Sequence, residues 1–410
     1  MKCRLCGAPV TRIVCDLHHA PPSNAYLSQA ELDLPEIYYP LRVLVCESCW
    51  LMQIDEYKQA AEIFSRDYRY YSSYSSSWVN HASDFVSMII PRLGLDQNSK
   101  VLEIASNDGY LLQFFVKKGI SCIGVDPAEG PAQEAKKRGI PTIRDFFSAT
   151  LAKNIVEKFG KRDLVIGNNV LAHVPDLNVF VEGLREVLAP DGTITLEFPH
   201  LLELMKNVQF DTIYHEHYSY FSLITARDLL KRHHLRIYDI ERLPTHGGSL
   251  RVYACDEESG MNPVSQAVSD CIDEEVVYGL NTSDAYVNFQ EKVNDIKEKF
   301  LSFLLEQKRV GKQVVGYGAA AKGNTLLNAC GIKGTELIRY VVDASPYKQD
   351  FFLPGSHIPI YHPSRIEKDK PDVVIIFPWN IAEEIVLLLK CTHNWNGEAI
   401  IPIPTIRVLR

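Results

Sequence analysis

The sequence lacks the features that define several broad classes of protein. No apolar run approaches the roughly 20 residues that a membrane-spanning helix requires, and the N-terminus, MKCRLCGAPV, has no apolar core of a signal peptide. Basic residues are not in excess, because 43 Lys and Arg face 51 Asp and Glu, for a net charge of −8. We therefore expect a cytoplasmic protein that binds neither nucleic acid nor a membrane surface. The sequence leaves the oligomeric state open, with a monomer as the simplest case.

Ten cysteines are present, and in a cytoplasmic protein they are not expected to form disulfides. Four of them form two Cys-x-x-Cys pairs near the N-terminus: Cys3, Cys6, Cys46 and Cys49. Each pair can place two thiolates on one tetrahedral ion, so we predict a closed, structural Zn²⁺ site that takes no part in catalysis. Two alternatives stay open: Cys15, His18 or His19 replaces one ligand, or the four cysteines are unrelated core residues.

The chain is long enough for two or three domains, and its patterns divide it into three. Residues 1–75 hold the cysteine pairs. Residues 76–245 alternate buried strands (VLEIAS, CIGVD, LVIGNN, TITLEF) with amphipathic helices, which predicts a doubly wound, Rossmann-like α/β domain. Residues 246–410 repeat this alternation and predict a second, smaller Rossmann-like α/β domain. The polar stretch from about 256 to 285 is the expected connector.

A turn rich in small residues follows the first central strand, in the sequence VLEIASNDGYLL. Such a turn before a helix forms a cradle for a nucleotide-like ligand. It contains one glycine and no phosphate-loop lysine, which favours a ligand without phosphate, such as S-adenosylmethionine. Asp126, at the end of the next strand, suits the ribose hydroxyls. The predicted cofactor-binding residues are Glu103, Ala105, Ser106, Asn107, Gly109, Asp126, Phe146, Phe147, Asn168 and Asn169. The simpler alternatives are an ordinary α/β turn and, for the two phenylalanines, core packing.

Residues 214–217 read Tyr-His-Glu-His and are followed by further aromatic residues. Two imidazoles and a carboxylate can exchange protons near neutral pH, and aromatic surroundings shift their pKa values. His173 follows the strand that ends in Asn168, so it lies near the same predicted ligand site. Histidines that move protons also occur in epimerases, and a solvated surface turn is the alternative without function.

The C-terminal block contains a second glycine turn, VVGYGAAAKGNTLLN. Its predicted contacts with a substrate nucleotide are Gly318, Lys322, Asn324 and Thr325, because glycine allows close approach and lysine can meet a diphosphate. A vestigial turn that merely packs is the alternative. His246 and Arg251, in the motif HGGSLR, are candidates for sugar or phosphate contacts. Asp343, Trp379 and Asn380 are weaker candidates.

These motifs together resemble a known family. The paired Cys-x-x-Cys, E-I-x-S-N-D-G, N-N-V-x-x-H-V-P, Y-H-E-H-Y-S-Y, H-G-G-S-L-R and G-Y-G-A-A-A-K-G-N-T occur in the order found in three-domain sugar C-3 methyltransferases. That family acts on nucleotide-linked 4-keto-6-deoxy sugars, as in mycarose and tetronitrose biosynthesis. One departure is Ala105, where the family more usually has glycine. A methyl group is small, so we expect the cofactor still to bind.

The resemblance implies a function and site roles. S-adenosylmethionine is the implied methyl donor, and the substrate nucleotide is expected between the middle and C-terminal domains. His217 is the implied general base, with Tyr214 and Glu216 close to it, and His173 and Tyr68 lining the sugar site.

The proposed reaction removes a proton from C-3, beside the ketone, and methylates that carbon. Imidazole alone is too weak for this step, so donors must stabilise the enolate oxygen, and Tyr214, Tyr68 and His173 are the candidates. Glu216 is a candidate to orient the ring of His217, and a contact with the substrate is the alternative that the sequence leaves open. The alternatives are an epimerase or an O-methyltransferase on the same scaffold, and a zinc-containing binding protein without activity.

Overall fold

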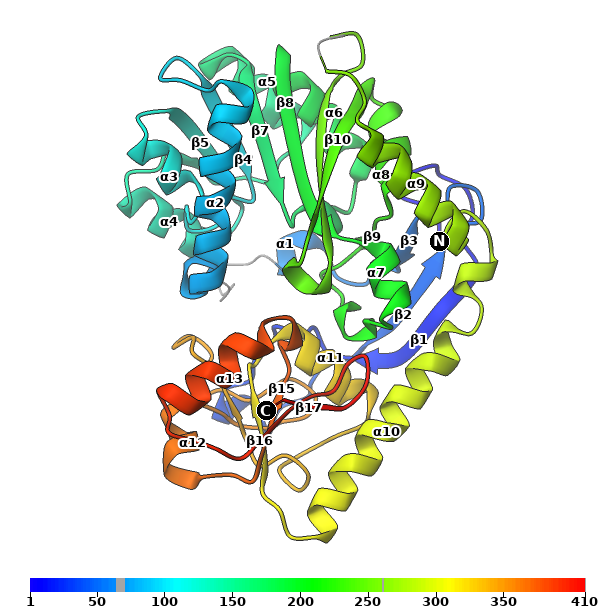
Figure 1. Cartoon of the computed structure of the whole chain (residues 1–410), viewed down its shortest axis with the longest axis vertical. Helices are drawn as coiled ribbons and strands as arrows, with labels where there is room; N and C mark the ends of the chain where they lie inside the picture. The colour runs from blue at the N-terminus through cyan, green and yellow to red at the C-terminus, as the bar shows by residue number, and fades with distance from the viewer. Residues whose placement is uncertain (64–70, 260–261, 410) are drawn as a thin grey trace.

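The computed structural model describes residues 1–63, 71–259 and 262–409 (Figure 1). Three sheets follow one another along the chain, with four, seven and six strands. The first is antiparallel, and the other two combine a parallel core with helices and an antiparallel edge. The predicted architecture of a small N-terminal domain and two α/β domains is therefore confirmed.

The N-terminal sheet has the strand order β1-β2-β3-β9. Its strands are β1 (Arg12–Ala20), β2 (Tyr39–Val45), β3 (Met52–Ile54) and β9 (Ser219–Tyr220). The 3₁₀ turn η1 (Gln29–Glu31) lies between β1 and β2 in the chain, and α1 (Ala60–Ile63) and the 3₁₀ turn η2 (Ser72–Tyr74) follow β3. Strand β9 belongs to the middle of the chain and pairs Tyr220 with Met52. The residues that follow the Tyr-His-Glu-His run are thus fixed by the first domain.

The central sheet has the order β10-β11-β8-β7-β4-β5-β6. Its strands are β4 (Lys100–Ile104), β5 (Ser121–Val125), β6 (Thr142–Ile143), β7 (Arg162–Asn168), β8 (Leu188–Pro199), β10 (Leu235–Leu243) and β11 (Ser249–Asp256). Its helices are α2 (Ser76–Leu93), α3 (Leu112–Lys117), α4 (Glu129–Lys137), α5 (Ala149–Phe159), α6 (Leu177–Val187), α7 (Leu201–Lys206) and α8 (Leu223–Lys231). Because β11 pairs with both β8 and β10, the sheet continues beyond the boundary that we predicted at residue 245 and ends at Asp256.

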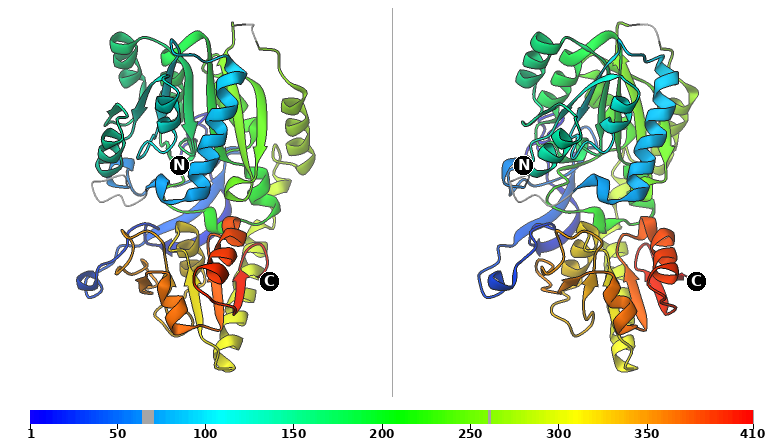
Figure 2. Two further views of the ribbon diagram at one scale, coloured as in Figure 1. Left: turned by 60° about the vertical axis from the view of Figure 1, so that its left-hand side comes forward. Right: turned by 90° about the vertical axis from the view of Figure 1, so that its left-hand side faces the viewer.

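The expected connector contains a helix, α9 (Gln266–Tyr278), which packs against α8 and β10. The long helix α10 (Phe289–Arg309) then descends along the side of the molecule to the C-terminal domain (Figures 1 and 2). Its buried residues recur every three or four positions: Phe289, Val293, Ile296, Phe300 and Leu304. That spacing forms one apolar face, which packs against β1 and β12 and so joins the first and last domains.

The C-terminal sheet has the order β14-β13-β12-β15-β16-β17. Its strands are β12 (Val314–Tyr317), β13 (Val341–Val342), β14 (Ile360–Tyr361), β15 (Val373–Ile376), β16 (Glu398–Ile401) and β17 (Arg407–Leu409), with helices α11 (Ala321–Ala329), α12 (Ser364–Asp369) and α13 (Ala382–Cys391). The parallel strands are buried on both faces, as their near-continuous apolar sequences predict.

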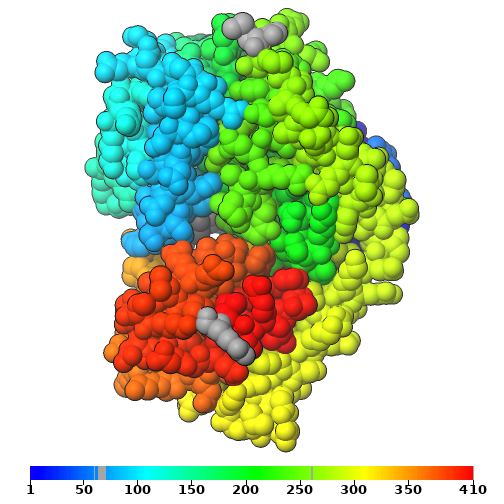
Figure 3. Space-filling model, viewed as in Figure 1, coloured from blue at the N-terminus to red at the C-terminus, as the bar shows by residue number. Residues whose placement is uncertain are grey.

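The carboxyl ends of the two parallel sheets face each other. Helix α11, which follows β12, packs on the turn η4 (Phe210–Thr212), and η7 (Trp379–Ile381), which follows β15, packs on η5 (Thr245–Gly247). Side chains of the two domains meet across the middle of the molecule (Figure 3). Open α/β sheets bind ligands at their carboxyl ends, so this boundary is the place to look for a site. Among the described residues, every helix is too short or too polar to cross a lipid bilayer.

Candidate active site

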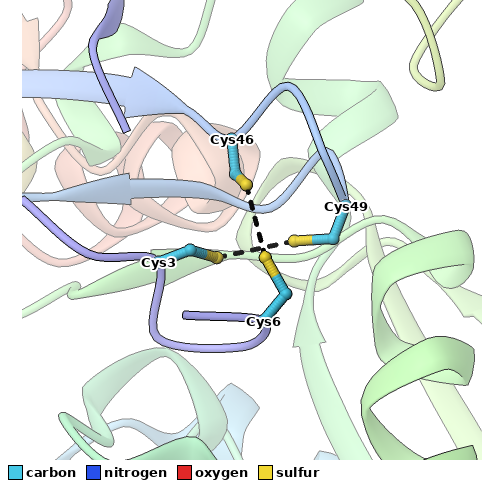
Figure 4. A group of neighbouring side chains, drawn as sticks. All are labelled: Cys3, Cys6, Cys46 and Cys49. Carbon is cyan, nitrogen blue, oxygen red and sulfur yellow. Dashed lines mark hydrogen bonds between the residues drawn. The ribbon is translucent and has the colours of Figure 1, made fainter. Parts of the chain in front are cut away.

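The four cysteines of the two Cys-x-x-Cys pairs converge at one point (Figure 4). Their sulfur atoms all lie within 4.8 Å of one another, with 3.5 Å between Cys3 and Cys49 and 3.6 Å between Cys6 and Cys46. Zinc–sulfur bonds of about 2.3 Å in a tetrahedron place sulfurs about 3.8 Å apart, so the cluster fits Zn²⁺. Gln53 donates from Nε2 to the Cys3 sulfur at 3.3 Å, which supports a thiolate there.

Both Cys-x-x-Cys segments are closed by the same backbone hydrogen bond. The amide of Gly7 donates to the carbonyl of Cys3 at 2.9 Å, and the amide of Trp50 donates to that of Cys46 at 2.7 Å. Gly7 and Trp50 both have a positive φ. The second segment therefore adopts with Trp50 the same left-handed conformation that the first adopts with glycine. Cys15 lies apart from the cluster in the core of the sheet, where burial raises the pKa of its thiol to about 12.

The predicted cofactor turn adopts a strained backbone path at the end of β4. Ala105, Asn107 and Gly109 all have positive φ, of 57°, 48° and 76°. The amides of Asn107 and Ala128 each donate to the carboxylate of Asp126 at 2.9 Å, which fixes this acid at the rim of the turn. Burial raises the pKa of Asp126 to about 6. The positive φ of Ala105 explains why glycine suits this position better.

Buried polar atoms without a protein partner gather at the same edge of the described structure. They belong to Glu103, Ser106, Asp108, Asn168 and Asn169. A buried polar group without a hydrogen bond costs about 1–3 kcal/mol, so this concentration indicates a polar ligand. Burial, with the charge of Asp126, raises the pKa of Glu103 well above its ordinary value. The set fits S-adenosylmethionine, whose amino acid and ribose groups offer matching donors and acceptors.

The two phenylalanines predicted beside the adenine differ in their surroundings. Phe147 packs edge to face on Phe180, with ring centroids 5.5 Å apart, and so belongs to the packing around α6. Phe146 is 40% exposed and stays the predicted neighbour of the adenine ring.

The Tyr-His-Glu-His run forms a tight turn, closed by the amide of His217, which donates to the carbonyl of Tyr214 at 2.9 Å. The turn brings the first and last side chains together. The Tyr214 hydroxyl donates to Nε2 of His217 at 2.8 Å, and the ring centroids are 4.0 Å apart. His215 points the other way and donates to the carbonyl of Pro40 at 3.2 Å, in the N-terminal domain.

A backbone carbonyl, and not the Glu216 carboxylate, orients His217. Nδ1 of His217 donates to the carbonyl of Thr212 at 3.0 Å, so Nε2 is the acceptor nitrogen of the neutral ring. Both carboxylate oxygens of Glu216 accept from Nδ2 of Asn24, at 2.9 and 2.8 Å. Of the two alternatives for Glu216, the pairing with His217 is therefore absent from the structure, because the turn sends these adjacent side chains in different directions.

Three histidines form a cluster around this turn: His173, His217 and His246. The His173 ring lies 4.8 Å from that of His217, and its Nδ1 donates to the carbonyl of Glu216 at 2.7 Å. Burial lowers the pKa of His173 to about 4 and, with the charge of His173, lowers that of His217 well below its ordinary value. Burial and the charge of Lys322 lower the pKa of His246 to about 4. At neutral pH all three rings are therefore uncharged and able to accept a proton.

The motif HGGSLR contributes His246 to this cluster but keeps Arg251 away from it. His246 packs against Trp78 at a centroid distance of 5.3 Å. Arg251 is 3% exposed and pairs with Glu197 at 3.0 Å and with Glu241 at 2.7 Å. Strand β11 carries this side chain into an internal ion pair, and its contact with sugar or phosphate stays a prediction.

The C-terminal glycine turn brings Lys322 to the domain boundary. Its Nζ donates to Oδ1 of Asn380 at 2.9 Å and lies 4.0 Å from the ring centroid of Trp379. Burial lowers the pKa of Lys322 to about 8, which leaves it mostly charged at neutral pH. Gly318 has a φ of 89°, and a Cβ atom there would lie 2.5 Å from Pro378, so the turn requires glycine.

Asn324 and Thr325 connect domains in the structure. Nδ2 of Asn324 donates to the carbonyl of Ser23 at 2.9 Å, and Oγ1 of Thr325 donates to that of Ile213 at 3.1 Å. Both side chains are buried. Helix α11 thus turns both side chains toward the other domains, and their contact with substrate stays a prediction.

Sequence reasoning missed Asn24 and Asp211. Asp211 accepts from Nε1 of Trp379 at 2.7 Å, and burial raises the pKa of this carboxyl group. Its place three residues before the Tyr-His-Glu-His run was a usable signal. Asn24 had none, because its partner is 192 residues away in the chain. Tyr68 lies outside the described residues, so its predicted role stays a prediction.

Known proteins match this chain over its whole length. Three family models cover it in order: "Putative zinc binding domain" over residues 3–64, "Methyltransferase domain" over 78–240 and "C-methyltransferase C-terminal domain" over 244–404. C-methyltransferase NovU from Streptomyces niveus is 36% identical over 408 residues, which are 100% of this chain and 96% of that protein.

More distant proteins match parts of the chain. A ubiquinone biosynthesis O-methyltransferase from Bartonella bacilliformis is 28% identical over 94 residues, 23% of this chain and 38% of that enzyme. The structure of magnesium protoporphyrin IX methyltransferase from Synechocystis covers 43% of this chain and 84% of its own, at 19% identity and a TM-score of 0.35. Because a relative 36% identical spans the whole chain and the three domain models follow in order, this protein belongs to the C-methyltransferase family.

Proposed function

We propose that this enzyme methylates C-3 of a nucleotide-linked 4-keto-6-deoxyhexose, with His217 removing the C-3 proton. One observation carries the proposal: a neutral imidazole with a fixed acceptor nitrogen lies beside Tyr214 and His173, at the boundary that also holds Lys322. The enzyme is a methyltransferase whose methyl donor is S-adenosylmethionine, which supplies an electrophilic methyl group on its sulfonium.

His217 suits the task of a general base. The Thr212 carbonyl holds the proton on Nδ1, so Nε2 can accept. Burial keeps the ring neutral in the resting enzyme, and negative charge that develops on a bound enolate raises its pKa as the proton moves. The base therefore gains strength when the reaction needs it.

Tyr214 is the proposed donor to the enolate oxygen. Its hydroxyl now donates to Nε2 of His217 at 2.8 Å, which is the atom that must receive the substrate proton. Substrate reaches Nε2 only when this hydroxyl turns away, and it then becomes available to the ketone oxygen. One preorganised donor of this kind is worth about 3 kcal/mol in the transition state. His173 is the second donor or acceptor of this pocket in the proposal.

The C-terminal domain is the proposed anchor for the nucleotide. Lys322 stands at the start of α11, where its charge and the helix amides suit a diphosphate. Asp343 accepts from the amides of Ala319 and Ser345, both at 2.8 Å, just as Asp126 accepts from two amides at the cofactor turn. Each acid thus follows a parallel strand and accepts from two backbone amides, which supports the proposal that each binds the hydroxyls of a ribose.

The test compares His217→Asn with His215→Asn, using S-adenosylmethionine and a 4-keto-6-deoxy nucleotide sugar in deuterated water. A general base contributes about 10²–10⁴-fold, so His217→Asn should lose methylation by at least about 100-fold and also lose deuterium uptake at C-3. His215→Asn is the matched control, because the ring of His215 bonds to the carbonyl of Pro40 and packs on Tyr39 in the N-terminal domain, and this variant should keep its activity. Full-rate methylation by His217→Asn refutes the base assignment.

Product analysis separates the alternative reactions. A methyl group on carbon supports the proposal, whereas a methyl group on oxygen indicates an O-methyltransferase. Deuterium uptake without methyl gain indicates an epimerase.

A further inference from the structure

The loop between β1 and β2 leaves its own sheet and runs along the C-terminal domain (Figure 2). Leu27 and Phe352 exchange backbone hydrogen bonds of 3.0 and 2.8 Å, and Ser23 receives the bond from Asn324 at 2.9 Å. The loop also closes on itself, because the amide of Ala25 donates to the carbonyl of Pro22 at 3.0 Å. These bonds hold the residues between them, Asn24 among them, in a fixed position.

Asn24 extends from this loop to the Tyr-His-Glu-His turn. Its Nδ2 reaches both carboxylate oxygens of Glu216, and its Oδ1 accepts from the Tyr26 hydroxyl at 3.2 Å. The single hydrogen of the Tyr26 hydroxyl is shared between Asn24 Oδ1 and the nearer carbonyl of Ala319 in the C-terminal glycine turn, at 2.7 Å. The amide of Asn24 is thereby oriented from both ends, with nitrogen toward Glu216 and oxygen toward Tyr26.

The hydrogen bonds favour one charge state of Glu216. An amide that donates to both oxygens matches a carboxylate, because a protonated carboxyl group would present a hydrogen to the same donor. Among the described residues, the charges of Lys58 and Lys348 act on this carboxylate, and Tyr26 and His173 are neutral titratable groups near it. Burial raises the pKa of Glu216 to about 7, because its effect exceeds the lowering by the Asn24 hydrogen bonds and by the charges of Lys58 and Lys348.

We propose that Asn24 is a positioning residue, by which the zinc-binding domain holds Glu216 as an oriented carboxylate for the reaction. The inference rests on the proposed function and adds Glu216 to it, because the turn that ends in the proposed base also carries Glu216, whose backbone carbonyl accepts from His173. It gives the N-terminal domain a part in activity as well as in stability. It also explains why the loop is clamped to the C-terminal domain, since all three domains must be in place for Asn24 to reach its partner.

The sign of the effect follows from the contacts. Donors to a carboxylate lower its pKa, so loss of Asn24 raises the pKa of Glu216 further above its ordinary value. The carboxylate form is then populated only at higher pH. A rise of about one unit from 7 lowers the ionised fraction at pH 7 about fivefold and leaves it nearly complete above pH 9.

The experiment measures the pKa of Glu216 in the full-length zinc-loaded enzyme by ¹³C NMR of labelled glutamate, with Glu216→Gln identifying the signal. Asn24→Ala should raise this pKa by about one unit, and Asn24→Asp, which keeps the size of the side chain, should raise it further. The acid limb of the kcat–pH profile should move by the same amount, with kcat recovered near pH 9. Asn178→Ala is the matched control, because Nδ2 of Asn178 also bonds across domains, to the carbonyls of Arg4 and Leu5. It should leave the pKa and the profile unchanged.

Two results overturn the inference in distinguishable ways. An unshifted Glu216 pKa in both Asn24→Ala and Asn24→Asp removes the role of Asn24 and leaves the proposed function intact. Wild-type kcat in Glu216→Gln removes Glu216 from the reaction and leaves the base assignment of His217 intact, whereas full-rate methylation by His217→Asn refutes the proposed function itself.

Discussion

Arg251 offers a sharp test of structure against sequence, because the motif suggested a ligand contact and the fold shows an internal ion pair. Its guanidinium is paired with Glu197 and Glu241 and lies 4.6 Å from the ring centroid of Phe85. Glu197 is fully buried and accepts further hydrogen bonds from His81 at 3.0 and 3.1 Å. The change Arg251→Met keeps the apolar volume and removes the charge.

The expected loss of stability follows from the buried carboxylate that is left behind. Breaking a buried ion pair by removing one partner costs about 3–5 kcal/mol. For a domain of about 180 residues each kcal/mol moves the melting temperature by about 2–4 °C, so the central domain should melt roughly 6–20 °C lower. Arg242→Met is the matched control, because the pair of Arg242 with Glu274 is 47% and 37% exposed and should contribute less than about 1 kcal/mol.

The pH dependence of stability provides a second test of the Arg251→Met substitution. Burial alone raises the pKa of Glu197, but the hydrogen bond from His81 and the charges of His81 and Arg251 hold it below its ordinary value. A lowered folded-state pKa stabilises the protein above the unfolded pKa, and this stabilisation is lost as the pH falls through the folded value. Loss of the Arg251 charge raises the pKa of Glu197, so the loss of stability in Arg251→Met should be complete at neutral pH and should shrink as the pH falls and Glu197 becomes protonated.

The assay is thermal unfolding at several pH values, together with KM for the nucleotide sugar at a temperature where the variant is folded. Our reasoning requires a lowered melting temperature with an unchanged KM. A variant that melts like wild type and shows a raised KM would refute it and restore the ligand contact.

Two further predictions concern the N-terminal domain and the cofactor turn. Cys6→Ser, or a strong chelator, should release about one zinc per chain, measured by metal analysis, and should lower stability and abolish activity. Activity is lost because β9, which follows the Tyr-His-Glu-His turn directly, pairs with β3 of the N-terminal domain. Activity retained in metal-free protein would contradict this coupling. Ala105→Gly should stabilise the protein by about 0.5–1 kcal/mol, because an L-residue at a φ of 57° is strained, and an unchanged or lower melting temperature would contradict that account.

The sequence by itself determined the local features of this protein. The alternation of buried strands and amphipathic helices predicted both α/β domains, and the two Cys-x-x-Cys pairs predicted a cluster that the structure brings together. The turn after β4 and the acid at the end of β5 were also predictable, because a strand, a turn and the next strand are set by neighbouring residues. The resemblance to C-methyltransferases, read from motifs in order, was confirmed.

Tertiary structure alone decided which polar side chains reach the active site. Arg251, Asn324 and Thr325 had suitable chemistry, but their strand or helix directs them into contacts with distant parts of the chain. Glu216 and His217 are adjacent, yet a turn of four residues separates their side chains, and Glu216 accepts its hydrogen bond from Asn24. Such pairs depend on how three domains pack, and no spacing in the sequence encodes that. Local pattern thus predicted the elements and the motifs, and the docking of the domains selected the partners.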